Sequence, residues 1–159
     1  MTRSASEDLL TTLTTGTPKE RSAALKALIE DLPAGWEEVL CQALQSEHNQ
    51  GKGFAKLRSE LCRQLAGSTH AEIPELLWGR LRDDVEPVAK TIAYVLWRYP
   101  SLVRRLPTAI VEHWDADRPY AERLLDAMID ADHPWPVELN SQTPAEVRAR
   151  LQENLQWRA

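Results

Sequence analysis

The residues best suited to acid–base or metal chemistry are four histidines scattered along the chain: His48, His70, His113 and His133. Only His113 has carboxylates nearby, at Asp115 and Asp117 in the segment HWDADRP. Such groups exchange protons or bind a metal only where the fold makes them converge. A turn between two helices, with Asp117 capping the second, explains the same residues. We therefore predict no catalytic residue and no metal site.

Other motifs that mark enzyme chemistry are absent from the sequence. There is no glycine-rich phosphate loop and no Gly-x-Ser-x-Gly turn. Cys41 and Cys62 lack the Cys-x-x-Cys spacing of redox and zinc sites, which predicts free thiols in a reducing compartment. We expect no cofactor, and the sequence favours a non-enzymatic role while leaving an enzymatic one open.

The composition indicates one water-soluble domain, residues 1–159, with an excess of negative charge. Lys and Arg total 19 against 24 Asp and Glu, a net charge of −5. This balance disfavours nucleic acid as a partner and favours basic proteins. No apolar run approaches the roughly 18 residues that cross a membrane, and the first ten residues do not resemble a signal peptide. We expect a cytoplasmic protein that does not bind membranes.

Leucine-rich stripes and helix start signals indicate an all-α fold. This fold would position the histidine, aspartate and cysteine side chains named above. Thr17, Pro18 and Glu20 form a capping-box start, and the same Thr-Pro-x-Glu pattern recurs from Thr143. Phenylalanine occurs once and β-branched runs are few, so no sheet is predicted. The short helices pair in order into hairpins.

A repeat period links these hairpins. The second helix of each has a central apolar residue, at Leu28, Leu61, Leu96 and Met128, at intervals of about 33 residues. The predicted repeats cover residues 6–33, 36–67, 71–99 and 101–131, followed by an irregular loop at 132–142 and a terminal helix at 143–158.

Three of these second helices share a pattern of small residues among leucines. They are ERSAALKAL from residue 20, DDVEPVAKTIAYVL from residue 83 and PYAERLLDAM from residue 119. The pattern resembles the second helix of HEAT-like and armadillo-like repeats. The resemblance implies an all-α, right-handed stack of about four antiparallel helical hairpins, a HEAT-like α-solenoid, plus a C-terminal capping helix. Ala89 and Pro107 depart from the pattern and leave a non-solenoid helical bundle as the alternative.

The aromatic residues supply the best candidates for a binding surface. Six Trp and three Tyr outnumber one Phe, a bias towards rings with a polar edge. Two residues before the central apolar residue of each repeat lie Lys26, Ser59, Tyr94 and Asp126. Because these residues are mostly polar, this position of the repeat register is predicted to be exposed. One residue after the central apolar residue lie Ile29, Cys62, Trp97 and Ile129. This position of the repeat register is predicted to be buried. We predict a binding ridge of Lys26, Lys90, Tyr94 and Asp126, for which an ordinary solvated face is the alternative explanation.

Trp135 lies in the irregular segment ADHPWPVELNSQT between two prolines. Loops of this length are uncommon unless they pack against the fold or have a function. Trp135 is therefore predicted either to cover the end of the helical array, which we favour, or to anchor a partner.

These observations predict an adaptor that binds another protein, one version being a bacterial regulatory or inhibitor-type protein. The resemblance also implies two enzymatic alternatives, a HEAT-like DNA glycosylase and a bilin lyase-like subunit. A third reading is a structural protein that associates with itself. The sequence fixes neither the partner nor the oligomeric state.

Overall fold

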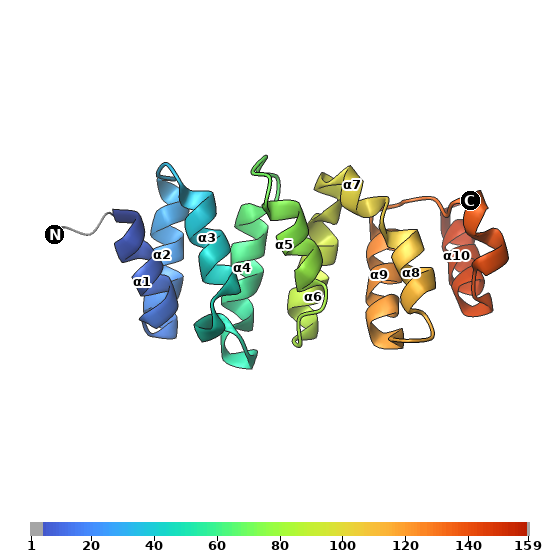
Figure 1. Cartoon of the computed structure of the whole chain (residues 1–159), viewed down its shortest axis with the longest axis horizontal. Coiled ribbons are helices and arrows are strands. Elements are labelled where there is room, and N and C mark those ends of the chain that lie inside the picture. The colour runs from blue at the N-terminus through green and yellow to red at the C-terminus, as the bar shows by residue number, and fades with distance from the viewer. Residues whose placement is uncertain (1–4, 159) are drawn as a thin grey trace. The chain divides into compact units, whose positions relative to one another are not determined.

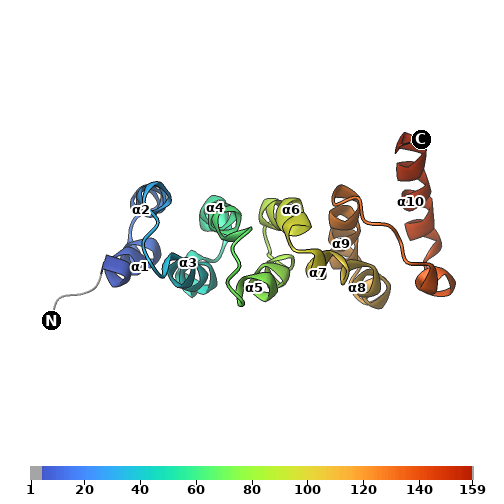
Figure 2. The same ribbon diagram turned by 90° about the horizontal axis from the view of Figure 1, so that it is seen from above.

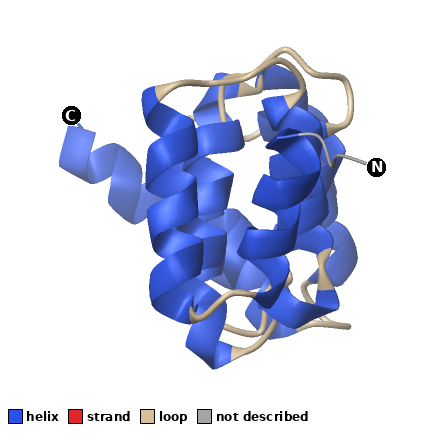
Figure 3. Cartoon of the chain, turned by 90° about the vertical axis from the view of Figure 1, so that its left-hand side faces the viewer, coloured by secondary structure: helices blue, strands red, loops and turns tan. Residues whose placement is uncertain are grey.

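The computed structural model describes the backbone of residues 5–158 and the side chains up to residue 154. Every regular element within residues 5–158 is a helix, as Figure 3 shows. The predicted all-α fold class is confirmed. No helix in this range is both long enough and apolar enough to cross a membrane.

Figure 1 shows the helices in the order in which they follow along the chain. The α-helices are α1 (Ala5–Thr15), α2 (Pro18–Glu30), α3 (Trp36–Gln45), α4 (Ala55–Leu65), α5 (Ile73–Arg80), α6 (Glu86–Val95), α7 (Pro100–Val103), α8 (Leu106–His113), α9 (Arg118–Asp130) and α10 (Ala145–Arg158). Within residues 5–158, short 3₁₀-helices connect them: η1 (Glu47–Asn49), η2 (Lys52–Phe54), η3 (Leu96–Arg98) and η4 (Val137–Gln142).

The chain divides into two compact units, and the boundary falls within α6. The N-terminal unit extends to Ile92 and the C-terminal unit begins at Ala93. Each unit has its own buried leucines, so each contains a core. The prediction of one domain with four repeats stays a prediction.

In the N-terminal unit, α1 packs against α2 and α3, and α4 packs against α2 and α3. Helices α1, α3 and α5 lie on one side, and α2 and α4 on the other (Figure 2). Leu13, Leu40 and Leu61 are fully buried between them. The predicted capping box is confirmed, because the Thr17 hydroxyl accepts the Glu20 N–H at 3.1 Å and the Thr17 N–H donates to Glu20 Oε1 at 3.3 Å.

A buried ion pair holds the α5–α6 connection against α4. Arg58 Nε and Nη2 donate to the two carboxylate oxygens of Asp83 at 2.8 and 2.9 Å. Arg58 Nη1 donates to the backbone carbonyls of Asn49 and Gly51 at 2.7 and 2.6 Å. Gly51 has a φ of +91°, a conformation that side-chain-bearing residues rarely adopt. The glycine thus allows the turn that presents its carbonyl to Arg58.

In the C-terminal unit, α8 and α9 form a closely packed hairpin. Pro107 lies in the first turn of α8, where its missing N–H costs no hydrogen bond. The chain before α9 consequently forms two short helices, α7 and α8, instead of one.

Helix α10 lies against α9 and forms two ion pairs with it. Arg118 Nη1 donates to Glu146 Oε2 at 3.1 Å, and Arg150 forms an ion pair with Asp126. Val147 is fully buried. Ion pairs with α9 and the burial of Val147 therefore both hold α10 in place.

The segment at 132–142 is more regular than predicted, because η4 occupies its second half. Pro134 and Pro136 each disfavour helical backbone at the residue before them, and residues 133–136 form no regular structure. Beyond Pro136 the chain turns into η4, and the Thr143 hydroxyl donates to the Leu139 carbonyl at 2.6 Å. The prediction of a wholly irregular loop is wrong for Val137–Gln142.

Candidate binding pocket around Trp135

The C-terminal end of α9 turns the chain sharply at Asp132. The Asp132 N–H donates to the Ile129 carbonyl at 3.0 Å, and the His133 N–H donates to the Met128 carbonyl at 3.2 Å. This pair of bonds is a Schellman motif, which requires a left-handed residue where glycine is usual. Asp132 fills that position with a φ of 57°. The motif places Asp132 and His133 directly beside the end of α9.

Trp135 is held in one orientation by a hydrogen bond from its indole edge. Trp135 Nε1 donates to Thr143 Oγ1 at 2.7 Å, and the ring is half-buried. The polar edge of the ring is therefore satisfied within the chain, while the rest of the indole lines the pocket described below. Both roles predicted for Trp135, covering the end of the helical array and anchoring a partner, stay predictions.

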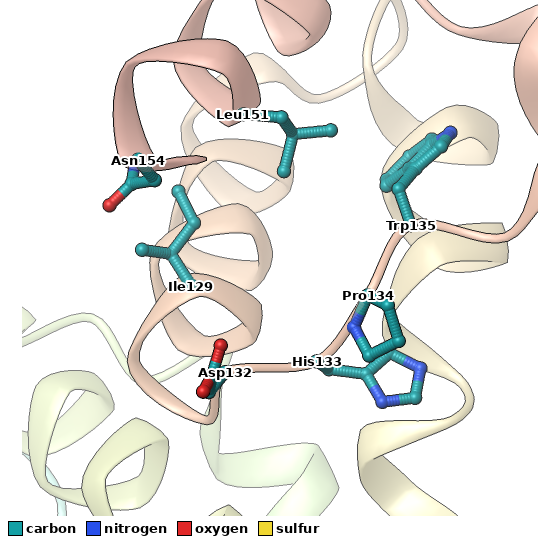
Figure 4. A pocket seen from close by; sticks show the side chains of 7 residues that line it. All are labelled: Ile129, Asp132, His133, Pro134, Trp135, Leu151 and Asn154. Carbon is teal, nitrogen blue, oxygen red and sulfur yellow. The ribbon is translucent and has the colours of Figure 1, made fainter. Parts of the chain in front are cut away.

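Helix α10 completes the enclosure with Leu151 and Asn154. Asn154 Nδ2 donates to the Arg150 carbonyl at 3.0 Å, which fixes the amide against its own helix. Figure 4 shows Ile129 of α9 and Leu151 of α10 on the side of the pocket opposite Trp135. The cavity has a volume of about 330 Å³ and is lined by Ile129, Asp132, His133, Pro134, Trp135, Leu151 and Asn154.

The pocket combines an apolar interior with a few polar groups. Ile129, Pro134, Trp135 and Leu151 supply apolar walls, and the polar side chains are Asp132, His133 and Asn154. This composition, and a volume near the lower end of roughly 300–1,000 Å³, are typical of sites that bind small molecules or single side chains. Among the described residues, no three His, Cys, Asp or Glu side chains lie close enough together to hold a metal ion.

Two carboxylates and the last carbonyls of the helix lie at the end of α9 beside the pocket. The last carbonyls of a helix carry a partial negative charge, and Asp130 and Asp132 add carboxylates there. Partial burial raises the pKa of Asp130, and the charge of Asp126 raises it further. The raised pKa reports an environment that already disfavours additional negative charge.

The structure places the five predicted binding residues in both units. Lys26 on α2 and Lys90 on α6 are exposed in the N-terminal unit, and Lys90 forms a 3.6 Å ion pair with Glu86. Tyr94, Asp126 and Trp135 belong to the C-terminal unit, where Tyr94 is 75% exposed and Asp126 binds Arg150. That these residues form one ridge stays a prediction.

The expectation that Trp97 is buried is wrong, because its side chain is 62% exposed. Helix α6 ends at Val95, and Trp97 lies in η3. A 3₁₀-helix has about 3.0 residues per turn rather than 3.6, so the α-helical register no longer gives the direction of residue 97. The repeat register also predicts the wrong burial for two other residues. Ile29, predicted to be buried, is 44% exposed, and Ser59, predicted to be exposed, is buried.

The residues of the segment HWDADRP take part in local structure. The Asp117 carboxylate accepts the Tyr120 N–H at 3.4 Å, which confirms its predicted capping role. The His113 ring contacts the Tyr120 ring edge-on, with centroids 5.1 Å apart. Asp115 Oδ1 lies 3.9 Å from Arg118 Nη2. A turn between α8 and α9 accounts for all three side chains.

A second cavity, of about 250 Å³, lies in the N-terminal unit beside the Arg58–Asp83 pair. Its charged side chains contact each other, since Arg80 Nη1 donates to Gln50 Oε1 at 3.0 Å and lies 4.0 Å from Asp83. Arg80 Nε is buried and has no acceptor among the described residues. A polar cavity of this size accommodates several water molecules at about 30 Å³ each, and water can accept from Nε. We interpret this cavity as hydrated and structural.

Sequence reasoning found Trp135 but missed its partners in the pocket. Asp132 carries no signal of a left-handed helix end, because glycine or asparagine is the usual marker. Leu151 and Asn154 come from a helix whose docking depends on tertiary contacts. Comparison of the chain with models of protein families, with curated proteins and with solved structures finds no match.

Proposed function

We propose that this chain is a non-enzymatic module that binds another protein, and that the Trp135 pocket is the centre of its contact surface. The module is a HEAT-like stack of helical hairpins that acts in the cytoplasm. The proposed activity is recognition, in which a side chain of the partner enters the pocket and the surrounding surface excludes water.

The observation that carries the proposal is the environment of Trp135. A tryptophan whose N–H is already satisfied offers its large ring for contact with little further loss of side-chain freedom. Tryptophans in partly enclosed pockets are common among the few residues that dominate the affinity of protein interfaces. Ile129 and Leu151 supply further apolar area for the same contact.

Two exposed aromatic side chains give additional support within the same unit. Tyr94 is 75% exposed and Trp97 is 62% exposed, and the Arg98 guanidinium lies 5.4 Å from the centre of the Trp97 ring. Tyrosine, tryptophan and arginine are enriched at protein interfaces. These residues form a second candidate contact for the same partner or for another.

The HEAT-like arrangement is supported by the sequence period of about 33 residues and by the pairing of successive helices. Within the N-terminal unit, α3 contacts both α1 of the preceding hairpin and α4 of its own. Contacts between neighbouring hairpins are the basis of stability in repeat proteins, and repeat surfaces are widely used for recognition.

The test begins with affinity purification from the native host to identify the partner, followed by measurement of dissociation constants with the purified partner. We expect Trp135→Ala to weaken binding by about 30-fold or more, as for a residue that dominates an interface. Tyr94→Ala tests the second contact in the same titration, with a smaller expected loss.

Leu32→Ala is the matched control, because Leu32 is an apolar side chain that is 43% exposed in the N-terminal unit. It should bind as the unmodified protein does. Equal affinity of the unmodified protein, Trp135→Ala and Tyr94→Ala would contradict the proposed contact surface. Tight binding to DNA that falls steeply with salt, with no protein partner, would contradict the proposed function.

A further inference from the structure

We infer that the Trp135 pocket receives an uncharged aromatic side chain of the partner protein, that of phenylalanine or tryptophan. This inference rests on the proposed function and adds the chemistry of the group that is recognised. It follows from three features of the pocket: the interactions that already engage its polar groups, its size, and the fixed indole ring that forms one of its walls.

The polar groups of the pocket interact within the chain, which favours an uncharged occupant. Trp135 Nε1 donates to Thr143 Oγ1, and Asn154 Nδ2 donates to the Arg150 carbonyl. Asp132 also has an interaction partner. A charged side chain that entered the pocket would therefore lose its water without finding a counter-charge kept for it, and an unpaired charge in such a place is costly. An apolar side chain meets no such cost, and the Trp135 N–H keeps its hydrogen bond when the pocket is filled.

The size of the pocket fits a ring better than a small aliphatic side chain. Its volume is about 330 Å³. An apolar protein cavity of roughly 150 Å³ is enough to bind benzene. The Trp135 pocket therefore has room for a phenyl or indole ring together with the methylene group that joins the ring to a backbone. A valine or leucine side chain would leave part of the space empty, and empty space forfeits dispersion contacts with the walls.

Trp135 offers an incoming ring a specific contact. Figure 4 shows Ile129 and Leu151 across the pocket from the Trp135 ring. A ring that enters between these walls packs against aliphatic groups on one side and against the indole on the other. Pairs of aromatic rings are more stable than their buried area alone explains, by an amount that corresponds to about two- to tenfold in affinity.

The wall that carries Trp135 is fixed before any partner binds. Pro134 and Pro136 flank Trp135, and each proline ring locks its own φ angle. The Thr143 hydroxyl accepts the Trp135 hydrogen bond and itself donates to the Leu139 carbonyl at 2.6 Å. A site that is already ordered loses less conformational freedom on binding, so more of the ring contact appears as affinity.

The test uses N-acetyl amino-acid amides, each of which carries a single side chain, so it does not depend on knowing the partner. The phenylalanine, tryptophan, cyclohexylalanine, leucine, lysine and glutamate compounds are titrated separately into the full chain, labelled with ¹⁵N and with ¹³C in the isoleucine methyl groups. The Trp135 indole N–H signal and the Ile129 methyl signal are followed by NMR. Trp135→Phe and Ile129→Val identify these two signals by their loss.

We expect the phenylalanine and tryptophan compounds to shift both signals with saturation. The phenylalanine compound should bind about fivefold more tightly than the cyclohexylalanine compound, whose saturated ring has a similar size but no aromatic character. The lysine and glutamate compounds should bind at least about tenfold more weakly than the phenylalanine compound, because each would bring an unpaired charge into the pocket. Raising the salt concentration should leave the affinity of the phenylalanine compound unchanged.

Two substitutions separate the indole ring from general apolar character. Trp135→Leu keeps an apolar wall but removes the ring. In this variant the Ile129 methyl signal should report nearly equal dissociation constants for the phenylalanine and cyclohexylalanine compounds. Trp97→Leu is the matched control, because Trp97 is 62% exposed and does not line the pocket. It should retain the fivefold preference for the phenylalanine compound.

The possible failures separate the inference from the proposed function. If the cyclohexylalanine and leucine compounds bind the unmodified protein as tightly as the phenylalanine compound, an aromatic occupant is wrong and the pocket remains the proposed contact. If the lysine or glutamate compound binds as tightly, an uncharged occupant is wrong. If no compound shifts either signal, the inference is wrong, whereas the proposed function is decided separately by the partner titrations of Trp135→Ala and Tyr94→Ala. A fivefold preference that persists in Trp135→Leu would show that the indole is not the group that recognises the ring.

Discussion

Asp83 is a carboxylate whose ionisation is set by competing influences. Burial alone would raise its pKa, but hydrogen bonds from Arg58 and from the Val85 N–H, together with the Arg58 charge, hold the pKa below its usual value. The side chains of Arg58 and Asp83 are only 1% and 2% exposed. Breaking such a pair is costly, because the remaining charge stays buried without its partner.

The lowered pKa gives a prediction about acid stability. The contribution of the pair is fully present above the unfolded-state pKa of about 3.9 and is lost as the pH falls through the lower folded-state pKa. At pH 6, we expect Asp83→Asn to reduce the free energy of unfolding by about 3–5 kcal/mol. This deficit should shrink between pH 5 and pH 2 when it is measured by urea unfolding.

Asp115→Asn is the control for this series, because the Asp115 side chain is fully exposed. It should leave the free energy of unfolding nearly unchanged at every pH. A deficit for Asp83→Asn that stays constant down to pH 2 would show that the carboxylate charge is not what stabilises the pair.

Single residues were predictable where their role is local. The capping roles of Thr17 and Asp117 follow from bonds to backbone groups three residues away. The exposure of Tyr94 and the burial of Cys62 follow from helical register. Trp97 was misplaced because the register assumes an unbroken α-helix, and a switch to 3₁₀ geometry at residue 96 leaves no clear mark in the sequence.

At the scale of elements, the sequence contains more about where helices begin and end than about what holds them together. The bounds of α2 and α9 are encoded by their capping residues, a proline in the first turn and a leucine stripe. The docking of α10 is not encoded in this way, because its partners on α9 lie more than 20 residues earlier. The Trp135 pocket depends on that docking, so the sequence could indicate Trp135 but not the cavity.

The contacts of α10 differ in expected strength, and this gives a prediction at the scale of that element. Val147 is fully buried, whereas the side chains of the Asp126–Arg150 pair are 57% and 38% exposed. We expect Val147→Ala to cost roughly 1–3 kcal/mol of unfolding free energy. Arg150→Ala should cost no more than about 1 kcal/mol, because exposed ion pairs are screened by water.

Hydrogen exchange of the α10 amides measures the docking directly. Val147→Ala should accelerate their exchange more than Arg150→Ala does, and the Trp135 indole NMR signal should shift with it. A larger effect of Arg150→Ala would mean that charge, rather than apolar burial, attaches α10 to α9.

At the scale of the whole molecule, each of the two units contains helices that are near in sequence and pack together. In the C-terminal unit α8 packs against α9, and in the N-terminal unit α1 packs against α2 and α3. Proteins built from such contacts lose stability locally when one element is weakened, since distant elements share few contacts with it. The fold class was predictable for the same reason, because local patterns determine most of the helices.

This locality gives a prediction for two matched substitutions. Leu61 in the N-terminal unit and Leu124 in the C-terminal unit are both fully buried, and each change to alanine should cost roughly 2–5 kcal/mol. We expect hydrogen exchange under native conditions to accelerate mainly in the substituted unit: in α3 and α4 for Leu61→Ala, and in α8 and α9 for Leu124→Ala. Acceleration of equal size throughout residues 5–158 for both variants would instead mean that the two cores unfold as a single cooperative structure, because each substitution would then lower the stability of every helix by the same amount.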